Sequence, residues 1–506
     1  MAPARSRLYK PLLLGVAAVL MLGVSFSQRL LTQVRHDLGL TRNDDPLKNA
    51  PPVLAFTTVA LGGFRGLIAN ALWVRATDLQ EQDKYFEQVQ LADWITKLQP
   101  HFTTVWVHQA WNMSYNISIK FTDPRDRWQW VLRGIELLRD EGLKYNPREP
   151  LMYRELAWHF QHKMGANLDD AHEYYKRIWG EEFSHAIGAA RPNYDELLKP
   201  ETDDARERMR LLREKFKMDP AWMREVDTRY GPLEWRLPEA HAIYWATFGL
   251  EKTEKEKLKK EDLIQLRRVI FQSMQLAFHR GRIIYAEKDG GSYVYGPNLD
   301  IVDRVNKAYE DMMAGEPDKA DNIATGHRNF LLTAVYFLYT HNRISQADKW
   351  YQYVKKKYPE TLLSSQEAAL KQANPQAVIP EKTLDEYALS RVAEDIGETS
   401  PDRVKAILLG LLRESFLDHA IGDNERGDGT YLFAKKVYNR YMEEIGKDAK
   451  KRVGLPTFAS LQEDVLGELL DPEKGLQPQF AAALRTLLNL PGNPTNAPAK
   501  APAPNP

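Results

Sequence analysis

With 506 residues and 43% hydrophobic content, the chain can bury a large core, yet it is longer than a single compact core usually organises. Its length therefore predicts several modules or a stack of repeats. Lys plus Arg and Asp plus Glu both total 69, a balance that excludes the broad positive field used in sequence-independent nucleic-acid binding. The absence of cysteine excludes disulfides, thiolate metal sites and cysteine nucleophiles.

The amino-terminal segment has the layout of a signal peptide or of a signal anchor. Residues 11–26 are apolar and uncharged, and they follow three basic residues, Arg5, Arg7 and Lys10. At about 1.5 Å per residue the run is roughly 24 Å long, so flanking residues must extend it to span a hydrocarbon core of about 30 Å. We predict a transmembrane signal anchor over 11–32, with cleavage of the leader as the alternative. In both cases the positive-inside rule predicts a cytoplasmic N-terminus and an extracytoplasmic remainder.

A second apolar stretch runs from Val53 to Val74 and contains Arg65, Asn70 and three glycines. The arginine opposes membrane insertion by about 3 kcal/mol, against the roughly 3 to 6 kcal/mol that the apolar residues contribute. Spanning is therefore marginal. We interpret this stretch as the beginning of the extracytoplasmic domain, and the alternative is a segment that lies in the membrane interface.

From about residue 66 onward, apolar residues follow helical spacing and alternate with short polar or proline-containing breaks, which predicts an all-α domain. A pattern of bulky, small and aromatic residues also returns in places, at a period of about 34 residues. Its clearest occurrence has these residues: Leu331, Ala334, Val335 and Leu338, then Ala347, Tyr351, Val354 and Pro359. Less complete occurrences lie at 72–100, 106–147 and 153–178.

These residues and their spacing resemble the tetratricopeptide repeat (TPR). The resemblance implies a right-handed α-solenoid of helical hairpins, in which small residues let the two helices of a pair approach closely. Together with the composition, it predicts the following segments: a basic flank at 1–10, the membrane helix at 11–32, a juxtamembrane segment at 33–65, amino-terminal repeats at 66–182, an irregular helical connection at 183–236, central repeats at 237–362, carboxy-terminal hairpins at 363–490 and an extended Pro- and Ala-rich tail at 491–506.

Motifs for catalysis or metal binding are weak. The chain has no phosphate loop, dinucleotide fingerprint or nucleophile elbow. The nearest approach to a metal cluster has these residues: His159, His162, Asp169, Asp170 and His172. Histidines spaced in this way on an amphipathic helix usually belong to its polar face. The oxygen-rich segment 423–429 lacks the central glycine and the closing glutamate of a calcium loop. We therefore predict no catalytic residue, metal or small-molecule cofactor.

The TPR resemblance also implies a groove in which partners bind. In that family, the position after the small residue of the first helix faces the concave surface. The corresponding and neighbouring residues here are Thr77, Trp111, Arg154, Trp158, Tyr336 and Tyr339. Trp, Tyr and Arg dominate binding hot spots because they bury a large area with little loss of rotamer freedom. The simpler interpretation is that Trp111 and Trp158 pack within the fold.

We therefore expect a non-catalytic, membrane-tethered, TPR-like scaffold that binds proteins of the bacterial cell envelope, on the periplasmic side of the cytoplasmic membrane. The leading alternative is a motif-poor helical enzyme that acts on an envelope substrate, with acid and base groups drawn from Glu155, His159, His162 and Glu173. A structural element associated with the membrane is the third possibility.

Overall fold

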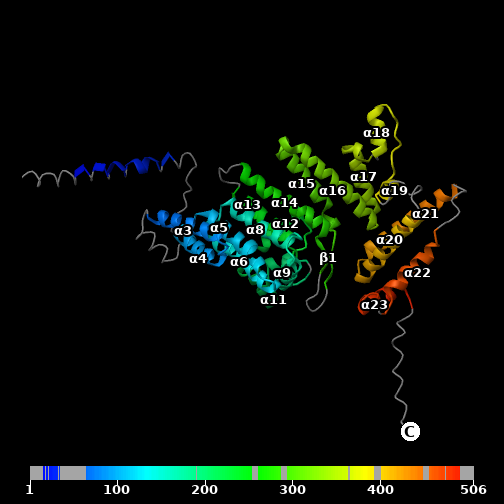
Figure 1. Ribbon diagram of the computed structural model, residues 1–506, viewed down its shortest axis with the longest axis horizontal. Helices are drawn as coiled ribbons and strands as arrows, with labels where there is room; N and C mark the ends of the chain where they lie inside the picture. Colours follow the sequence, from blue (N-terminus) through cyan, green and yellow to red (C-terminus); the bar gives the residue numbers. More distant parts are fainter. Residues whose placement is uncertain are drawn as a thin grey trace, which may run out of the picture. The chain divides into compact units, whose positions relative to one another are not determined.

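The computed structural model describes residues 15–16, 19–20, 22–24, 26–31, 33–34, 64–189, 191–253, 260–286, 293–362, 365–391, 401–447, 455–472 and 474–490. These residues are predominantly helical, which confirms the predicted helical class (Figure 1). The predicted flank 1–10 and tail 491–506 lie outside the described residues, as does most of 33–65. Among the described helices, none combines the length and the apolar character needed to cross a membrane.

The chain forms two compact units. Unit 1 comprises Met1–Leu156 and Phe248–Leu266, and unit 2 comprises Ala157–Thr247 and Arg267–Pro506. The boundaries of the units fall within three helices, α8 (Pro150–Trp158), α13 (Pro238–Thr253) and α14 (Lys260–Arg280).

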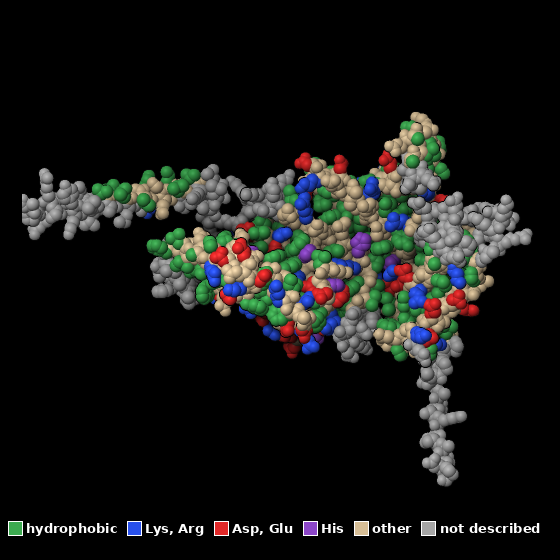
Figure 2. Space-filling model, viewed as in Figure 1, with side chains coloured by type: hydrophobic (Ala, Val, Ile, Leu, Met, Phe, Trp, Pro, Cys, Tyr) green, Lys and Arg blue, Asp and Glu red, His purple; other side chains and the backbone are tan. Residues whose placement is uncertain are grey.

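Unit 1 is built from consecutive helices joined by short turns. Its further α-helices are α3 (Phe64–Glu81), α4 (Tyr85–Leu98), α5 (Thr103–Trp111), α6 (Pro124–Glu136) and α7 (Leu143–Tyr145). Two π-helical segments, Asn112–Ile117 and Leu137–Gly142, and one 3₁₀ turn, Ser118–Lys120, continue these helices. The exposed side chains of α3 include large apolar ones, and Figure 2 shows hydrophobic side chains gathered over this helix.

Gly134 shows why the second helix of one predicted repeat needs a small residue. A Cβ atom at this position would lie 2.3 Å from Ser114 Oγ and 2.9 Å from the carbonyl oxygen of Ala110. The backbone of α6 therefore approaches the preceding helical segment at a distance that only glycine permits. The start of α6 is fixed by Asp123, whose carboxylate accepts a hydrogen bond of 2.8 Å from the Arg125 amide ahead of the first turn.

Unit 2 contains the remaining helices. They are α9 (His172–Ile187), α10 (Tyr194–Leu198), α11 (Asp203–Glu214), α12 (Pro220–Tyr230), α15 (Val302–Gly315), α16 (Ala320–Thr340), α17 (Ile344–Lys357), α18 (Ser365–Ala373), α19 (Leu384–Ser390), α20 (Pro401–Ile421), α21 (Asn424–Lys447), α22 (Phe458–Leu469) and α23 (Pro478–Leu487). Shorter turns are the π-helix His159–Gly165 and the 3₁₀ segments Leu299–Ile301, Pro317–Lys319 and Pro359–Leu362.

Helices α16 and α17 form the hairpin that contains the clearest repeat pattern. The apolar and small residues of that pattern are buried: Leu331, Ala334, Val335, Leu338, Ala347, Tyr351 and Val354. The turn between the helices passes through Asn342, which has a φ of 58°. This left-handed conformation is tolerated by asparagine better than by most other residues, so the turn chemistry agrees with the helix pattern on both sides.

One feature differs from the expectation of an all-helical domain. Strands β1 (Arg282–Ala286) and β2 (Tyr293–Gly296) form an antiparallel pair, with Arg282 opposite Gly296. Their β-branched and aromatic residues favour strands, but the runs are too short to produce a clear two-residue alternation. Within the oxygen-rich segment 423–429, the residues from Asn424 onward form the first turns of α21.

Candidate functional site

Three of the predicted groove residues belong to unit 1. Thr77 is exposed on α3, and its hydroxyl donates to a carbonyl oxygen of its own helix at 3.1 Å. Trp111 ends α5 with 37% exposure, and its ring stacks on Tyr115 at a centroid distance of 5.8 Å. Arg154 donates to the buried carboxylate of Glu155 at 2.6 Å. These contacts are local, within one helix or one helical turn of each residue.

The other three predicted residues belong to unit 2. Trp158 stacks on His162 with 4.5 Å between ring centroids and an interplanar angle of 11°. Tyr336 and Tyr339 lie together on α16, and their rings contact Phe433 of α21 at 6.1 and 5.8 Å. The structure therefore brings Tyr336 and Tyr339 to one contact between two helices.

Tyr339 is only 3% exposed, so its contacts are with other residues of unit 2. Its hydroxyl donates to the carboxylate of Asp385 and accepts from Lys436 Nζ at 2.7 Å. Burial, reinforced by the adjacent carboxylate, raises the pKa of the Tyr339 hydroxyl. Of these two tyrosines, it is the half-buried Tyr336 that lines a cavity.

That cavity has a volume of about 280 Å³, and we call it the aromatic cavity. The end of α14, strand β2, and helices α16, α20 and α21 contribute to it. Its lining residues are His279, Tyr295, Gly296, Pro297, Tyr336, Phe337, Thr340, His341, Leu411, Glu414, Arg426 and Thr430. Aromatic rings form much of the wall, and a small number of polar groups converge between them.

His341, a residue of this cavity's wall, has a buried hydrogen-bond acceptor without a partner among the described residues. Its Nδ1 atom lies 2.7 Å from the carbonyl oxygen of Phe337. Because a carbonyl only accepts, Nδ1 carries the proton and Nε2 keeps its lone pair. Among the described residues Nε2 has no hydrogen-bond partner, and the side chain is buried at 2% exposure. Burial lowers the pKa of His341, so the ring is neutral at pH 7.

The wall also contains one acidic and one basic side chain, Glu414 and Arg426. Arg426 contacts the carboxylate of Glu414, and its Nε lies 3.4 Å from Asp418 Oδ2. Burial raises the pKa of Asp418 to about 7. These three side chains hold α20 and α21 together beside the cavity.

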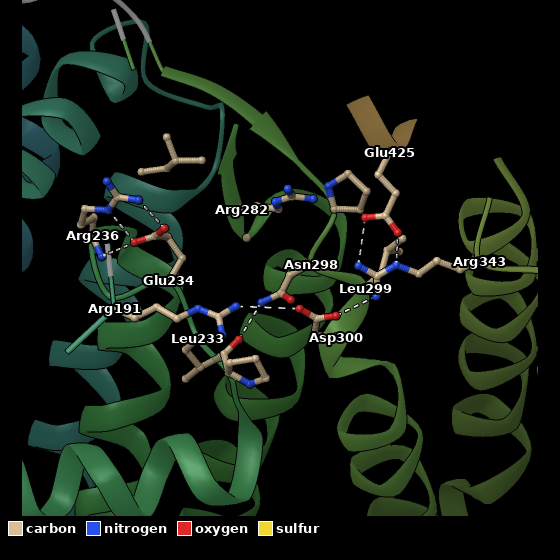
Figure 3. Close-up of a pocket in the computed structure, with 14 residues that line it drawn as sticks. Arg191, Leu233, Glu234, Arg236, Arg282, Asn298, Leu299, Asp300, Arg343 and Glu425 are labelled. Atoms are coloured by element: carbon tan, nitrogen blue, oxygen red, sulfur yellow. Dashed lines mark hydrogen bonds and ion pairs between the residues drawn. The ribbon is translucent and has the colours of Figure 1, made fainter. Parts of the chain in front are cut away.

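A second cavity of about 280 Å³, which we call the arginine cavity, shares Pro297 with the first. Figure 3 shows the residues that line it. Four arginines contribute to its wall: Arg191, Arg236, Arg282 and Arg343. The other lining residues are Pro232, Leu233, Glu234, Gly281, Ile283, Pro297, Asn298, Leu299, Asp300 and Glu425. No pattern in the sequence groups these residues, because they come from loops and helix ends that are far apart in the chain.

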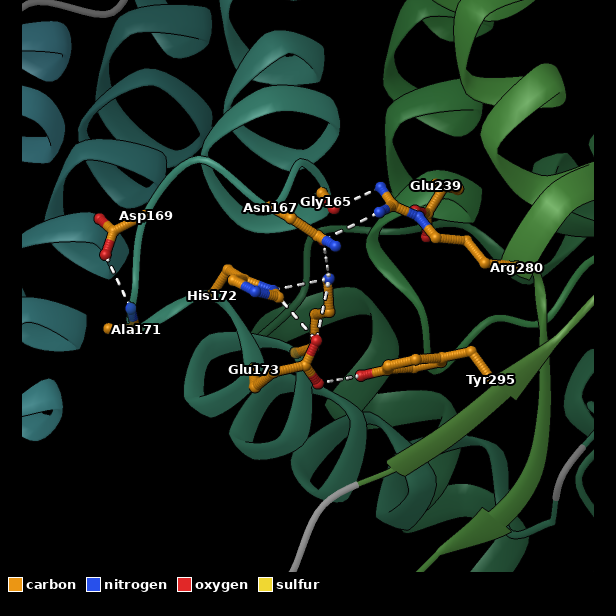
Figure 4. A network of polar contacts seen from close by, with 10 residues as sticks. Gly165, Asn167, Asp169, Ala171, His172, Glu173, Glu239, Arg280 and Tyr295 are labelled. Atoms are coloured by element: carbon orange, nitrogen blue, oxygen red, sulfur yellow. Dashed lines mark hydrogen bonds and ion pairs between the residues drawn. The ribbon is translucent and has the colours of Figure 1, made fainter. Parts of the chain in front are cut away.

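Of the predicted histidine cluster, His172 belongs to an internal polar network (Figure 4), whereas His159 and His162 lie in the π-helix His159–Gly165. Lys176 Nζ lies 2.9 Å from His172 Nδ1, 3.3 Å from Asn167 Oδ1 and 3.5 Å from Glu173 Oε1. The hydroxyl of Tyr295 donates to Glu173 at 2.8 Å. Burial lowers the pKa of the Lys176 ammonium. Within the described ranges, no three His, Asp or Glu side chains are arranged to hold a metal ion.

No known protein family, no curated protein and no solved structure matches this chain.

Proposed function

We propose that this chain is a non-catalytic, membrane-tethered, TPR-like scaffold of the bacterial cell envelope, and that the aromatic cavity holds a side chain of a protein partner. The size and the walls of this cavity carry the proposal. A volume of about 280 Å³ falls just below the range of about 300 to 1,000 Å³ typical of small-molecule sites. It suits one or two side chains of a polypeptide that lies across the surface.

The chemistry of the cavity fits such a partner. Tyr336, Phe337 and Tyr295 supply aromatic surface for an apolar or aromatic side chain. Aromatic side chains in fixed positions lose little rotamer freedom on binding, which is why they dominate hot spots.

The solenoid and the tether are further parts of the proposal. Consecutive helices pair as hairpins in α3 with α4, α16 with α17 and α20 with α21, which supports a right-handed stack of TPR-like repeats. The basic and apolar amino-terminal residues support a membrane helix over 11–32, with unit 1 and unit 2 on the periplasmic side.

The test is chemical crosslinking in intact membranes, followed by recovery of the native chain and of a Tyr336→Ala variant. A matched control is Tyr174→Ala, because Tyr174 is also a half-buried tyrosine of unit 2 but lies on α9 outside the cavity. We expect the native chain and the control to recover the same specific envelope proteins. With Tyr336→Ala, the recovered amount of these proteins should fall at least tenfold. Equal recovery from the three folded chains would refute the assignment of the cavity.

A further inference from the structure

We propose that the arginine cavity binds an oxyanion, a carboxylate or phosphate group carried by the same partner. The second half of this statement rests on the proposed function, whereas oxyanion binding itself does not. Two kinds of arginine line the cavity, and the difference between them carries the inference (Figure 3).

Two of the four arginines are fixed by carboxylates of the chain. Arg236 makes a two-pronged pair with Glu234, with both distances at 2.7 Å. Arg343 pairs in the same way with Glu425 at 2.5 and 3.1 Å, and it also donates to Asp300 at 2.7 Å. These pairs neutralise their charges locally, and they hold the walls in place before any ligand binds.

The other two arginines keep their donors available. The side chains of Arg191 and Arg282 are 66% and 45% exposed. Their nearest carboxylates, Asp300 and Asp423, lie at 3.8 and 3.9 Å, which is beyond hydrogen-bond distance. Neither guanidinium donates a hydrogen bond to any described residue. Each offers a planar set of N–H donors that matches the oxygens of a carboxylate or a phosphate.

Asp423 does not accept a hydrogen bond from Arg282, because hydrogen bonds of its backbone fix its position. Its amide donates to the carbonyl of Asp418 at 2.8 Å, and its carbonyl accepts from the amide of Gly427 at 2.9 Å. Both carboxylate oxygens are buried and lack a hydrogen-bond partner within the described residues. Asp423 is outside the lining of the cavity, so it stabilises the charge of Arg282 without occupying the space that a ligand would take.

The loop that carries part of the wall is also held in place. Asn298 Nδ2 donates to the carbonyl of Pro232 at 2.7 Å, and the Asn298 amide donates to the carbonyl of Phe278 at 2.9 Å. This part of the wall is therefore in place without a ligand, and binding mainly requires ordering of the exposed side chains of Arg191 and Arg282.

The position of the arginine cavity defines the chemistry of the partner. It shares Pro297 with the aromatic cavity, so a single short segment can reach both. Such a segment would carry an acidic residue, a phosphorylated residue or a free carboxyl terminus close to an apolar or aromatic residue.

The first test uses inorganic phosphate as the probe and the thermal unfolding of the full chain in detergent as the measurement. At constant ionic strength, we expect a saturable rise of about 2 °C in the unfolding midpoint of the native chain. A double variant, Arg191→Gln with Arg282→Gln, should lose most of this rise. The control, Arg206→Gln with Arg210→Gln, removes two exposed charges of α11 and should retain it. No rise in the native chain, or an equal rise in the double variant, would overturn oxyanion binding.

The second test identifies the source of the oxyanion. Fluorescence anisotropy compares labelled peptides that each contain one phenylalanine and differ only in bearing a free carboxyl terminus, an amidated terminus, an aspartate or a phosphoserine. We expect one anionic peptide to bind at least tenfold more tightly than the amidated, uncharged peptide. In Tyr336→Ala, peptide binding should fall while the phosphate response remains. A phosphate response without any preference for anionic peptides would overturn the link to a polypeptide partner and leave the oxyanion site standing.

Discussion

Single titratable side chains make the stability of unit 2 depend on pH. His327 is fully buried, with Nε2 at 2.8 Å from Asn306 Oδ1 and Nδ1 at 3.0 Å from the Tyr358 hydroxyl. Both contacts suit a neutral ring. Burial, together with the charge of Lys357, lowers the pKa of His327 to about 4.

This histidine should destabilise unit 2 in acid. Because the folded-state pKa lies below the unfolded value of about 6.5, the unfolded chain takes up the proton first, and stability falls as the pH drops from 6.5 towards 4. We expect a loss of about 2 kcal/mol between pH 7 and pH 4.5, measured by urea unfolding. His327→Gln should flatten this dependence, whereas His185→Gln, at an exposed position, should leave it intact. Identical pH profiles for the two variants would contradict the assignment.

Asp418 should act in the opposite direction. Burial raises its folded-state pKa to about 7, so the folded chain holds a proton that the unfolded chain releases near pH 4. Its contribution to stability is present in acid and is lost as the pH rises through 7, by about 2 kcal/mol between pH 5 and pH 8. Asp418→Asn removes the ionisation and should stabilise the chain at pH 8 more than at pH 5. The exposed Asp464→Asn is the control for a general charge effect.

At the scale of elements, α21 lies very close to the turn that follows α16, and both contribute to the wall of the aromatic cavity. A Cβ atom on Gly429, in the first turns of α21, would lie 1.9 Å from the carbonyl oxygen of Thr340 and 2.7 Å from the amide of Asn342. The helix therefore presses against the turn that follows α16, beside His341 and Thr430 of the cavity wall.

Gly429→Ala should separate these two elements. Since both contacts are with backbone atoms, the helix must shift, and we expect a destabilisation of about 2 kcal/mol together with loss of binding in the cavity. Gly410→Ala is the matched control, because nothing lies within 4 Å of its Cβ position on α20. That substitution should stabilise the helix by about 0.5 to 1 kcal/mol. Denaturant unfolding of both variants measures the contrast, and a neutral Gly429→Ala would show that the turn yields easily.

The sequence predicted local elements better than their assembly. Helical spacing and small residues placed the buried faces of α16 and α17, because these signals repeat within one turn or one hairpin. The strands β1 and β2 were missed, since their signal extends over few residues. Of the predicted groove residues, Tyr336 lines the aromatic cavity, but His341 was not found. Its role depends on a carbonyl of its own helix and on walls from other elements, which no single stretch of sequence encodes.

At the scale of the whole molecule, the proposed membrane tether would decide where the chain acts. A variant that begins at residue 33 should keep the thermal midpoint of the full chain, because the buried apolar residues of the described part of unit 1 begin at Ala69 of α3. It should move from the membrane fraction to the soluble fraction on cell lysis. Persistent membrane association would point to a second attachment, for which the exposed Phe64, Leu67 and Val74 of α3 are the first residues to replace with glutamine.

The shared wall at Pro297 has a consequence for selectivity. Two weak contacts on one short segment do not simply add, because the first places the second group at a high effective concentration beside its own cavity. A partner that has both groups would then bind far more tightly than a partner that has only one of them. The two cavities together would select segments that have both an anionic and an apolar group, and proteins with only one of these groups would bind weakly.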